Sequence, residues 1–574
     1  MYVLGLACAT SLHHGAALLR DGEIVGAVEE ERFVRRKGYG YAPPGRPDAN
    51  LINDASITLE EAFPHHSVRW LLDRAGISLE AVEAIAVNGV PARFEASYGA
   101  LERHRPPRIL VEGRHVYVPH HLAHAASSYW LSGFDRATVI TIDGRGERET
   151  ACAFDARGDV LRRGLEVLVG AEGSIGGAYE TVTRLLGFGP YGQGSTMALA
   201  PFGTPRHSLR DLFELESHRH ARIREVALKA TFLSLQRDYE GPLDDAHRDL
   251  AASAQAALER CVITFVKEVL TTAPPGPLCL AGGVVLNCAM NSRLARLPGV
   301  SEVFVLPAAH DVGTAIGAAL EAARHLGAPA PRRRLRTAAL GPAFDDDEHA
   351  AACAAAGLRA SRRDDIAGEV AARLADGQVV AWFDGALEIG PRALGQRSLL
   401  ADPRRADLHG RLNAMKGREP WRPFAPSILA GTEGDWLEGA FDSPFMLFTF
   451  PVRPERRAEA PAIVHVDGTT RPQSVHPDVL PRYARLIEGF RSLTGLPFVL
   501  NTSLNGRGEP IVCTPADGVA CFTSLGADAL ALGDLLVEKP GGRGARRYPS
   551  RRRRDATAAS GGTGRRSSSP KRSR

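Results

Sequence analysis

The sequence predicts an α/β protein with two folded domains and a basic tail. Apolar runs of strand length alternate with segments of helical periodicity over most of the 574 residues, which is the pattern of α/β folds. The chain is too long for one hydrophobic core. The stretch 328–337, APAPRRRLRT, combines Pro and Arg without apolar periodicity and suits an interdomain linker. We therefore expect one domain at 1–330 and a second at 339–540.

In the first domain, strands separated by tight turns occur twice. Apolar runs at 3–7 and 16–20 lead into IVGAVEEERF through the Asp-Gly hairpin turn of RDGE. The same order returns at 138–163, where TVITID, ETACAFD and VLRRG are divided by glycine-containing turns. Period and turn signals predict four further elements: a helix at 65–76, a strand in AIAVNGV, a helix at 249–270, and a strand, Gly-Gly turn and helix start at 278–291.

The second domain repeats the alternation of helices and strands. Its clearest strands are QVVAWF (378–383) and LPFVLN (496–501). Beyond it, residues 541–574 hold twelve Arg or Lys and a single acid, and this Arg/Ser/Gly-rich tail is expected to be disordered. The whole chain carries +4, so the other 540 residues carry −7. An acidic body disfavours nucleic acid as its partner and leaves the partner of the tail undetermined.

Cysteine usage and hydropathy indicate a cytoplasmic protein. The eight cysteines are scattered and form no C-x-x-C pair, which favours reduced thiols over disulfides or a zinc ribbon. No stretch offers the run of about 18 apolar residues that a membrane span needs. The first residues, MYVLGLACATSL, lack the basic leader of a signal peptide and are interpreted as a buried strand.

One helix and two acidic positions could form a metal site. His120 and His124 are four residues apart in the Ala-rich PHHLAHAASSYW, so both imidazoles would project from one helix face, whereas His121 would not. Asp143 ends the strand TVITID, and Asp311 precedes a helix of small residues. Two imidazoles and two carboxylates suit a divalent first-row metal. The alternatives are a solvated or core histidine pair, and aspartates that serve as turn or N-cap residues.

Three glycine elements follow predicted strands in the first domain: YGQGS (191–195), AGGVVLN (281–287) and DVGTAIG (311–317). Glycine lets a backbone approach phosphate closely, and helix N-termini bind anions. Each element alone is a weak signal, because glycine turns are common. Together they resemble the phosphate and adenosine loops of the actin, sugar-kinase and Hsp70 class.

The second domain contains polar motifs rich in cations. They are EIGPRALGQRSLLADPR, NAMKGREPWRPFAPS, HVDGTTRPQ and NTSLNGRGEP. Arg binds phosphate and carboxylate oxygens in pairs, whereas Lys acts as a compact charge. The chain has only six lysines against 64 arginines, so many of these arginines could simply be solvated. Convergence on a small anion is favoured where Pro, Gly and Asn fix the backbone, and it would involve Arg392, Arg397, Lys416, Arg418, Arg422, Arg471, Asn501 and Arg507.

These motifs, in this order, resemble the O-carbamoyltransferase family of the nodulation protein U and antibiotic-tailoring types. The resemblance spans nearly all of residues 1–540. It implies an actin-like N-terminal domain, built from a duplicated ribonuclease-H-like unit and akin to tRNA threonylcarbamoyl transferases, and then a YrdC-like α/β domain. It also implies an enzyme that uses Mg-bound ATP, carbamoyl phosphate and a divalent metal, which we expect to be Fe(2+).

The resemblance assigns a reaction to each domain. In the second domain, carbamoyl phosphate and ATP would give carbamoyl-adenylate, with Lys416, Arg422, Arg471, Asn501 and Arg507 as catalytic residues together with Arg392 and Arg397. In the first domain, the carbamoyl group would pass to a hydroxyl of a sugar, nucleoside or antibiotic. Metal ligands there would be His120, His124, Asp143 and Asp311. Nucleotide contacts would come from Gly282, Gly283 and Asn287, with Gly192 and Gly194 as further candidates.

Two departures from the family pattern fall on the acceptor side. The first hairpin turn reads His13-His14-Gly15 where the family often has His-Asp, and Gln193-Gly194-Ser195 replaces a common acidic-Gly-Lys. Both leave the acceptor and the general base open. Lys37 in the retained EEERFVRRK is a candidate for the carbamoyl or phosphate end. Asp249, which we expect to open a helix, is either a base or an N-cap.

Two other functions remain as alternatives. One is a threonylcarbamoyl-type tRNA modification enzyme, which the acidic body disfavours. The other is a non-catalytic nucleotide-binding protein with a nucleic-acid-binding tail, which the cationic and metal-ligand sets disfavour. A small-molecule partner without membrane contact is expected, and a homodimer is one possible assembly.

Overall fold

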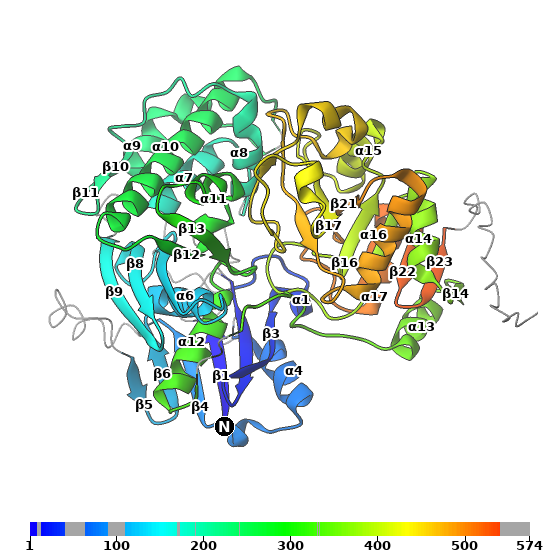
Figure 1. Ribbon diagram of the computed structural model, residues 1–574, viewed down its shortest axis with the longest axis horizontal. Coiled ribbons are helices and arrows are strands. Elements are labelled where there is room, and N and C mark those ends of the chain that lie inside the picture. The colour runs from blue at the N-terminus through cyan, green and yellow to red at the C-terminus, as the bar shows by residue number, and fades with distance from the viewer. Residues whose placement is uncertain are drawn as a thin grey trace, which may run out of the picture.

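The computed structural model describes residues 1–8, 13–40, 63–89, 109–168, 173–189, 191–239, 241–329, 331 and 333–539. The basic tail predicted at 541–574 lies outside the described residues. Two lobes stand side by side in Figure 1, one coloured blue to green and the other yellow-green to red. The strands up to residue 305 build the sheets of the N-terminal lobe. Those from residue 360 to 538 build the large sheet of the C-terminal lobe and a separate two-stranded sheet of β18 (Phe450–Pro451) and β19 (Thr469–Thr470).

The first sheet of the N-terminal lobe begins with an antiparallel meander. Its strand order is β3-β2-β1-β4-β6-β5. β1–β2 and β2–β3 pair antiparallel, whereas β4 is parallel to both β1 and β6. The predicted Asp-Gly turn joins β2 to β3, and Asp21 and Gly22 both have positive φ, as a type I′ turn requires. The bounds are β1 Tyr2–Ala7, β2 Gly15–Arg20, β3 Glu23–Glu29, β4 Ala84–Asn88, β5 Leu110–Glu112 and β6 His115–Val118.

The second sheet repeats this arrangement. Its order is β13-β12-β7-β8-β9, in which β7, β8 and β9 form the antiparallel meander and β12 and β13 continue in parallel. The repeated order of a three-strand meander followed by parallel strands is the duplicated, actin-like architecture that the sequence predicted. The bounds are β7 Arg136–Ile142, β8 Glu149–Arg157, β9 Val160–Leu168, β12 Gly276–Ala281 and β13 Val300–Val305.

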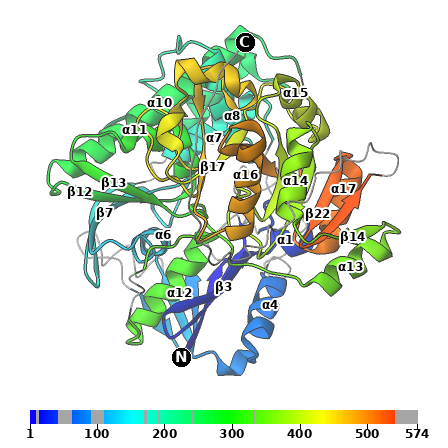
Figure 2. The same ribbon diagram turned by 45° about the vertical axis from the view of Figure 1, so that its right-hand side comes forward.

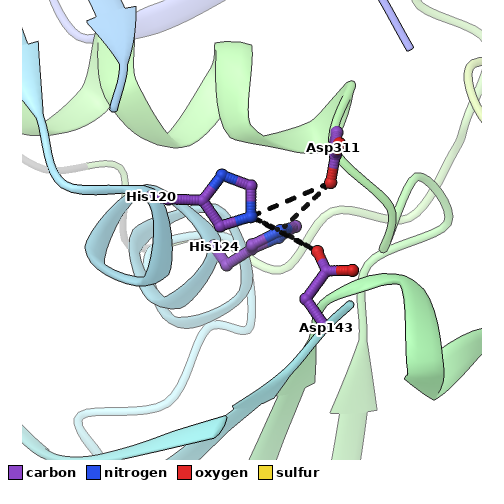
Figure 3. A group of neighbouring side chains, drawn as sticks. All are labelled: His120, His124, Asp143 and Asp311. Atoms are coloured by element: carbon purple, nitrogen blue, oxygen red, sulfur yellow. Dashed lines mark hydrogen bonds and ion pairs between the residues drawn. The ribbon is translucent and has the colours of Figure 1, made fainter. Parts of the chain in front are cut away.

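Two buried helices pack against each other between these sheets. They are α6 (His120–Tyr129), which is rich in Ala and Ser, and α12 (Gly313–His325), which is rich in Ala and Gly. A Cβ placed on Gly317 of α12 would lie 1.8 Å from the carbonyl O of Ala123 in α6. Only glycine permits this approach, which brings the N-terminal ends of both helices to the carboxyl end of β7 (Figure 3).

Further helices and one hairpin complete the N-terminal lobe. The predicted helix at 65–76 is confirmed as α4 (His65–Ala75). The expectation that Asp249 opens a helix is wrong: α10 (Asp245–Leu270) starts one turn earlier, because Asp244 caps it through a reciprocal pair with His247. The other elements here are α7 Ile175–Leu185, α8 Gln193–Leu199, α9 Glu225–Thr231, α11 Cys288–Leu294 and the hairpin β10 Phe213–Ser217 with β11 His220–Ile223.

The C-terminal lobe is built on one mixed eight-stranded sheet, ordered β14-β23-β22-β15-β16-β21-β17-β20. Helix α14 packs on α16, and α13 on α17, and both pairs contact the sheet. This agrees with the YrdC-like α/β domain expected. Its strands are β14 Ala360–Arg362, β15 Val380–Phe383, β16 Arg397–Ala401, β17 Ala425–Leu429, β20 Gln473–Val475, β21 Phe498–Ser503, β22 Ala529–Leu532 and β23 Leu535–Glu538. Its helices are α13 Asp346–Ala355, α14 Ile366–Ala375, α15 Ala406–Met415, α16 Pro481–Thr494 and α17 Pro515–Leu525.

The short helix α1 (Glu31–Val34) lies where the lobes meet, as both ribbon views show (Figures 1 and 2). Just after it, Arg35 donates from Nη1 to the carbonyl O of Ile511 at 2.8 Å. The linker contacts the N-terminal lobe, because Leu335 N donates to Leu131 O at 2.8 Å. No helix in the described part of the chain is long and apolar enough to cross a membrane. All eight cysteines are unpaired.

Candidate functional site

The four predicted metal ligands come together in the N-terminal lobe (Figure 3). One donor atom from each of His120, His124, Asp143 and Asp311 lies within 4.8 Å of the others. His124 Nε2 is 2.9 Å and His120 Nε2 is 3.3 Å from Asp143 Oδ2. Asp311 Oδ1 is 3.7 to 3.8 Å from the same two nitrogens.

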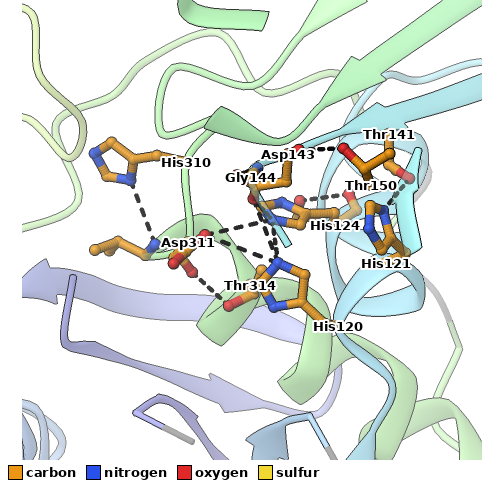
Figure 4. A network of polar contacts seen from close by, with 12 residues as sticks. His120, His121, His124, Thr141, Asp143, Gly144, Thr150, His310, Asp311 and Thr314 are labelled. Atoms are coloured by element: carbon orange, nitrogen blue, oxygen red, sulfur yellow. Dashed lines mark hydrogen bonds and ion pairs between the residues drawn. The ribbon is translucent and has the colours of Figure 1, made fainter. Parts of the chain in front are cut away.

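Local structure fixes each of these donors (Figure 4). The two imidazoles share one face of α6, and its first amide, His120 N, donates to the Glu147 carboxylate at 2.9 Å. Asp143 follows the last residue of β7. Its backbone N donates to Thr150 O, and its backbone O accepts from Thr150 Oγ1. The next histidine, His121, points elsewhere: its Nδ1 is 2.7 Å from Thr141 Oγ1 and its Nε2 is 3.1 Å from Glu149 O. His121 is therefore not a ligand candidate, as predicted.

The electrostatics of this group favour a divalent cation. His120 Nε2 and His124 Nε2 are only 3.1 Å apart and both are buried. Burial lowers the pKa of His120, but the neighbouring carboxylates outweigh it and raise that pKa to about 9. The pKa of Asp143 lies well below its usual range because the two imidazoles outweigh the effect of burial. Two nitrogens and two carboxylate oxygens facing one point fit a first-row metal ion.

The Gly-Gly turn borders the four candidate metal ligands His120, His124, Asp143 and Asp311, here called the metal group. Gly282 has φ of 98°, and a Cβ there would lie 2.1 Å from Ile142 O at the end of β7. A Cβ on Gly283 would lie 3.1 Å from Asp143 Oδ1. Asn287 caps α11 by accepting from Met290 N at 3.1 Å, and its amide exchanges hydrogen bonds with Gln255. The turn thus lies against the candidate metal ligand Asp143, while the Asn287 side chain is held by protein groups.

Cations from the C-terminal lobe gather opposite this turn. Burial lowers the pKa of Arg392 most, and Arg471 and Arg422 lower it further by their charge. Burial also lowers the pKa of Arg418 most, and the charges of Arg422 and Arg471 lower that pKa as well. These four guanidinium groups therefore lie close enough to repel one another. Such a concentration of positive charge favours the binding of an anion.

These four arginines (Arg392, Arg418, Arg422 and Arg471), here called the cationic group, reach the N-terminal lobe. Arg392 Nη2 lies 3.5 Å from Leu286 O, in the turn after Gly283. Gly194, at the start of α8, faces Arg422, whose Nη2 would lie 3.8 Å from a Cβ there. Gly192 packs behind it against Phe188. Lys37 is exposed and follows α1 at the junction of the lobes.

Three predicted catalytic residues are bound to protein groups. Lys416 is buried and donates from Nζ to Ser503 O, to Asn505 O at 3.0 Å and to Asn505 Oδ1 at 2.8 Å. Arg397 is buried, donates to backbone carbonyls that include Asp384 O at 2.7 Å, and stacks on Phe383. Asn501 Nδ2 donates to Ala393 O and Ser427 Oγ, which leaves its buried Oδ1 without a partner among the described residues.

The remaining predicted residues fall into two sets. His13 stacks on His310 with ring centroids 4.9 Å apart and contacts Tyr191 at 4.5 Å, and the neighbouring His14 is buried. His310 precedes the candidate metal ligand Asp311, so this set adjoins the metal group. Arg507, by contrast, is exposed and lies over the ring of Tyr239. Asp249 accepts from Thr204 N at 2.7 Å and pairs with Arg206, and neither partner is a predicted site residue.

The sequence did not point to two residues, Glu388 and Gln255, that hold the predicted site residues in place through hydrogen bonds. Glu388 is buried, and its Oε1 accepts from Leu394 N at 2.9 Å and Gln396 N at 2.7 Å, which folds the loop that carries Arg392. Gln255 holds Asn287. The one available signal for Glu388 was an acid inside the apolar and glycine-rich EIGPRALG, where a buried charge needs partners.

The chain is similar to known carbamoyltransferases. Residues 111–320 match the family model described as carbamoyltransferase N-terminus, and residues 371–539 match carbamoyltransferase C-terminus. Nodulation protein NolNO of Sinorhizobium fredii is 35% identical over 563 residues, which cover 92% of this chain and 79% of that protein. The 3'-hydroxymethylcephem-O-carbamoyltransferase of Amycolatopsis lactamdurans is 35% identical over 302 residues, 50% of this chain and 54% of that protein.

Among solved structures, full-length HypF in its phosphate- and nucleotide-bound form shares 14% identity and a TM-score of 0.35, over 57% of this chain and 56% of that chain. The family assignment rests instead on the family models and on the long match to NolNO. The chain belongs to the carbamoyltransferase family and is a transferase enzyme.

Proposed function

We propose that this enzyme is an ATP-dependent O-carbamoyltransferase that works through carbamoyl-adenylate. The observation that carries the proposal is the position of Arg392, which belongs to the cationic group of the C-terminal lobe yet lies against Leu286 beside the metal group. An anion site and a metal-ligand set that meet at one interface suit a nucleotide intermediate formed on one side and used on the other.

The first reaction would take place among the cations. Water converts carbamoyl phosphate to carbamate and phosphate, and a carbamate oxygen then attacks the α-phosphorus of ATP with loss of pyrophosphate. Arg392, Arg422 and Arg471 would stabilise the charge on the phosphoryl oxygens. Lys416 would hold the loop after β21 through its bonds to Ser503 and Asn505, and this loop carries Arg507. The interface between the lobes would limit hydrolysis of the adenylate.

The second reaction would take place at the metal group. The acceptor hydroxyl oxygen attacks the carbamoyl carbon, AMP leaves, and the hydroxyl proton passes to a base. Gly282 and Gly283 leave room for the nucleotide backbone. A divalent metal held by His120, His124, Asp143 and Asp311 would supply Lewis-acid stabilisation of negative charge. We propose that this metal is iron(II). His13 and Lys37 are the residues proposed to contact the carbamoyl group or the acceptor.

The acceptor is proposed to be a small molecule with a free hydroxyl, such as a sugar, nucleoside or antibiotic. The relatives named as hydroxymethylcephem carbamoyltransferases support this class. A tRNA acceptor is disfavoured because the body without its tail carries −7. The test is incubation of the full chain with carbamoyl phosphate, ATP and Fe(2+) against a panel of hydroxylated metabolites, followed by mass spectrometry for a gain of about 43 Da. AMP release without any carbamoylated product in a panel that includes sugars, nucleosides and cephems would count against the proposed acceptor class.

A further inference from the structure

A fully buried arginine lies at the junction of the two lobes. Arg32 in α1 has 2% exposure, and Glu29 at the end of β3, the closer of its two ion-pair partners, has 3%; the other partner is Glu31. The Arg32 Nε donates to Glu29 Oε2 at 2.5 Å, and its Nη2 contacts the same oxygen. A buried charge pair of this kind is costly unless its remaining hydrogen-bonding groups are also satisfied.

Arg32 also bonds the C-terminal lobe. Its Nη2 donates to Gly390 O at 2.7 Å. Gly390 has φ of 100°, and a Cβ there would lie 2.5 Å from Pro307 O. The backbone of the loop that presents Arg392 is thus in direct contact with the segment that leads to Asp311. Glu388 fixes the rest of this loop from inside.

On the other side, the Arg32–Glu29 pair contacts His310, the residue before Asp311. Glu29 Oε1 lies 3.4 Å from His310 Nε2. His310 Nδ1 accepts from Val312 N at 3.3 Å, so Nε2 carries the proton and faces the carboxylate. Figure 4 shows His310 held in the turn that presents Asp311. Glu29 is therefore in contact with the residue next to a metal ligand.

We propose that Arg32 is a positioning residue that sets the metal ligand Asp311 and the anion-binding Arg392 at a fixed separation across the lobe junction. It binds the Asp311 turn through Glu29 and His310, and it binds the Arg392 loop directly through Gly390. The role given to Arg392 rests on the proposed function, whereas the contacts of Arg32 do not. Loss of Arg32 should disturb both sites together, although it touches neither ligand.

Two binding measurements without turnover test this proposal. Co(2+) titration followed by absorption reports the metal group, and calorimetry with phosphonoacetate on chelator-treated protein reports the cationic group. Arg32→Met should weaken each affinity by about tenfold or more, the usual effect of residues that support a ligand from behind. In Arg32→Lys, the ammonium group can pair with the Glu29 carboxylate but cannot also bond the carbonyl O of Gly390. This variant should therefore restore Co(2+) binding and leave phosphonoacetate binding weak. If Arg32→Met does not fold, Arg32→Lys carries the test.

Arg35 offers a matched control on the same segment. It bonds Ile511 O and Pro510 O of the C-terminal lobe and pairs with Asp517, so Arg35→Met also removes contacts between the lobes. This variant should keep both affinities within about twofold of the wild type. Equal losses in Arg32→Met and Arg35→Met, or an effect of Arg32→Met on one ligand alone, would overturn the proposal. Because neither assay needs carbamoyl transfer, failure of the proposed function would appear separately, as absent product with both affinities intact.

Discussion

The guanidinium of Arg392 lies 3.5 Å from the carbonyl oxygen of Leu286, although 106 residues separate them in the chain. Arg392 belongs to the cationic loop of the C-terminal lobe, and Leu286 ends the Gly-Gly turn that borders the metal group. The two candidate sites therefore meet at one interface. An intermediate formed beside Arg392 would have a short path to the metal group.

Replacing Arg392 should impair the first reaction most. Arg392→Met removes a half-buried cation that contacts the N-terminal lobe, so carbamoyl-phosphate-dependent cleavage of ATP to AMP should fall by about 100-fold or more. Pyrophosphate release measures this step. The control is Arg453→Met, because Arg453 donates to Gly434 O on the same lobe and belongs to neither site. A loss of less than about threefold in Arg392→Met would remove Arg392 from the proposed mechanism.

A pair of variants should separate the two reactions. Lys416→Ala is expected to abolish cleavage of ATP to AMP, because it removes three hydrogen bonds to the loop after β21. His124→Ala should keep most of that cleavage while losing bound metal and acceptor carbamoylation. Metal content, AMP release and product mass are measured on both proteins. Should both variants lose the same step to the same degree, the assignment of one reaction to each lobe is wrong.

The sequence was most informative where a site is built from nearby residues. The four-residue spacing of His120 and His124 and the place of Asp143 at the end of a strand marked them as candidates, and the family resemblance implied the same residues. It was less informative where burial decides the role of a charge. Arg397 satisfies backbone carbonyls, and Asp249 bonds Thr204 and Arg206 inside a helix that starts at Asp245. Partners such as Gly390 of Arg32 lie hundreds of residues away, and no local pattern encodes them.

Metal affinity should depend on pH, because protons compete for the same nitrogens. Burial lowers the pKa of His120, but Asp143 and Asp311 outweigh it and raise that pKa from 6.5 to about 9. A metal ion binds neutral imidazole, so a proton must leave His120 below this pKa. Co(2+) affinity should therefore rise by about tenfold per pH unit up to about pH 9 and then level off. Calorimetry in two buffers of different ionisation enthalpy counts the proton released, and an affinity that is flat from about pH 7 to 9 would contradict this account.

Gly282 tests how the nucleotide turn supports the metal group. It has φ of 98°, and a Cβ there would lie 2.1 Å from Ile142 O, one residue before Asp143. Gly282→Ala should therefore combine backbone strain with a displacement of Asp143. Gly299 is a matched control, since its φ is 90° but a Cβ there would meet nothing within 4 Å. Gly299→Ala should cost about 1–2 kcal/mol through strain alone.

Gly282→Ala should cost about 1–3 kcal/mol more than Gly299→Ala, because the added methyl group overlaps main-chain atoms of β7. It should also weaken Co(2+) binding by about tenfold or more, whereas Gly299→Ala should not. Thermal unfolding and Co(2+) titration of the two variants measure both effects. Equal melting temperatures and equal Co(2+) affinities in the two proteins would mean that the turn does not position Asp143.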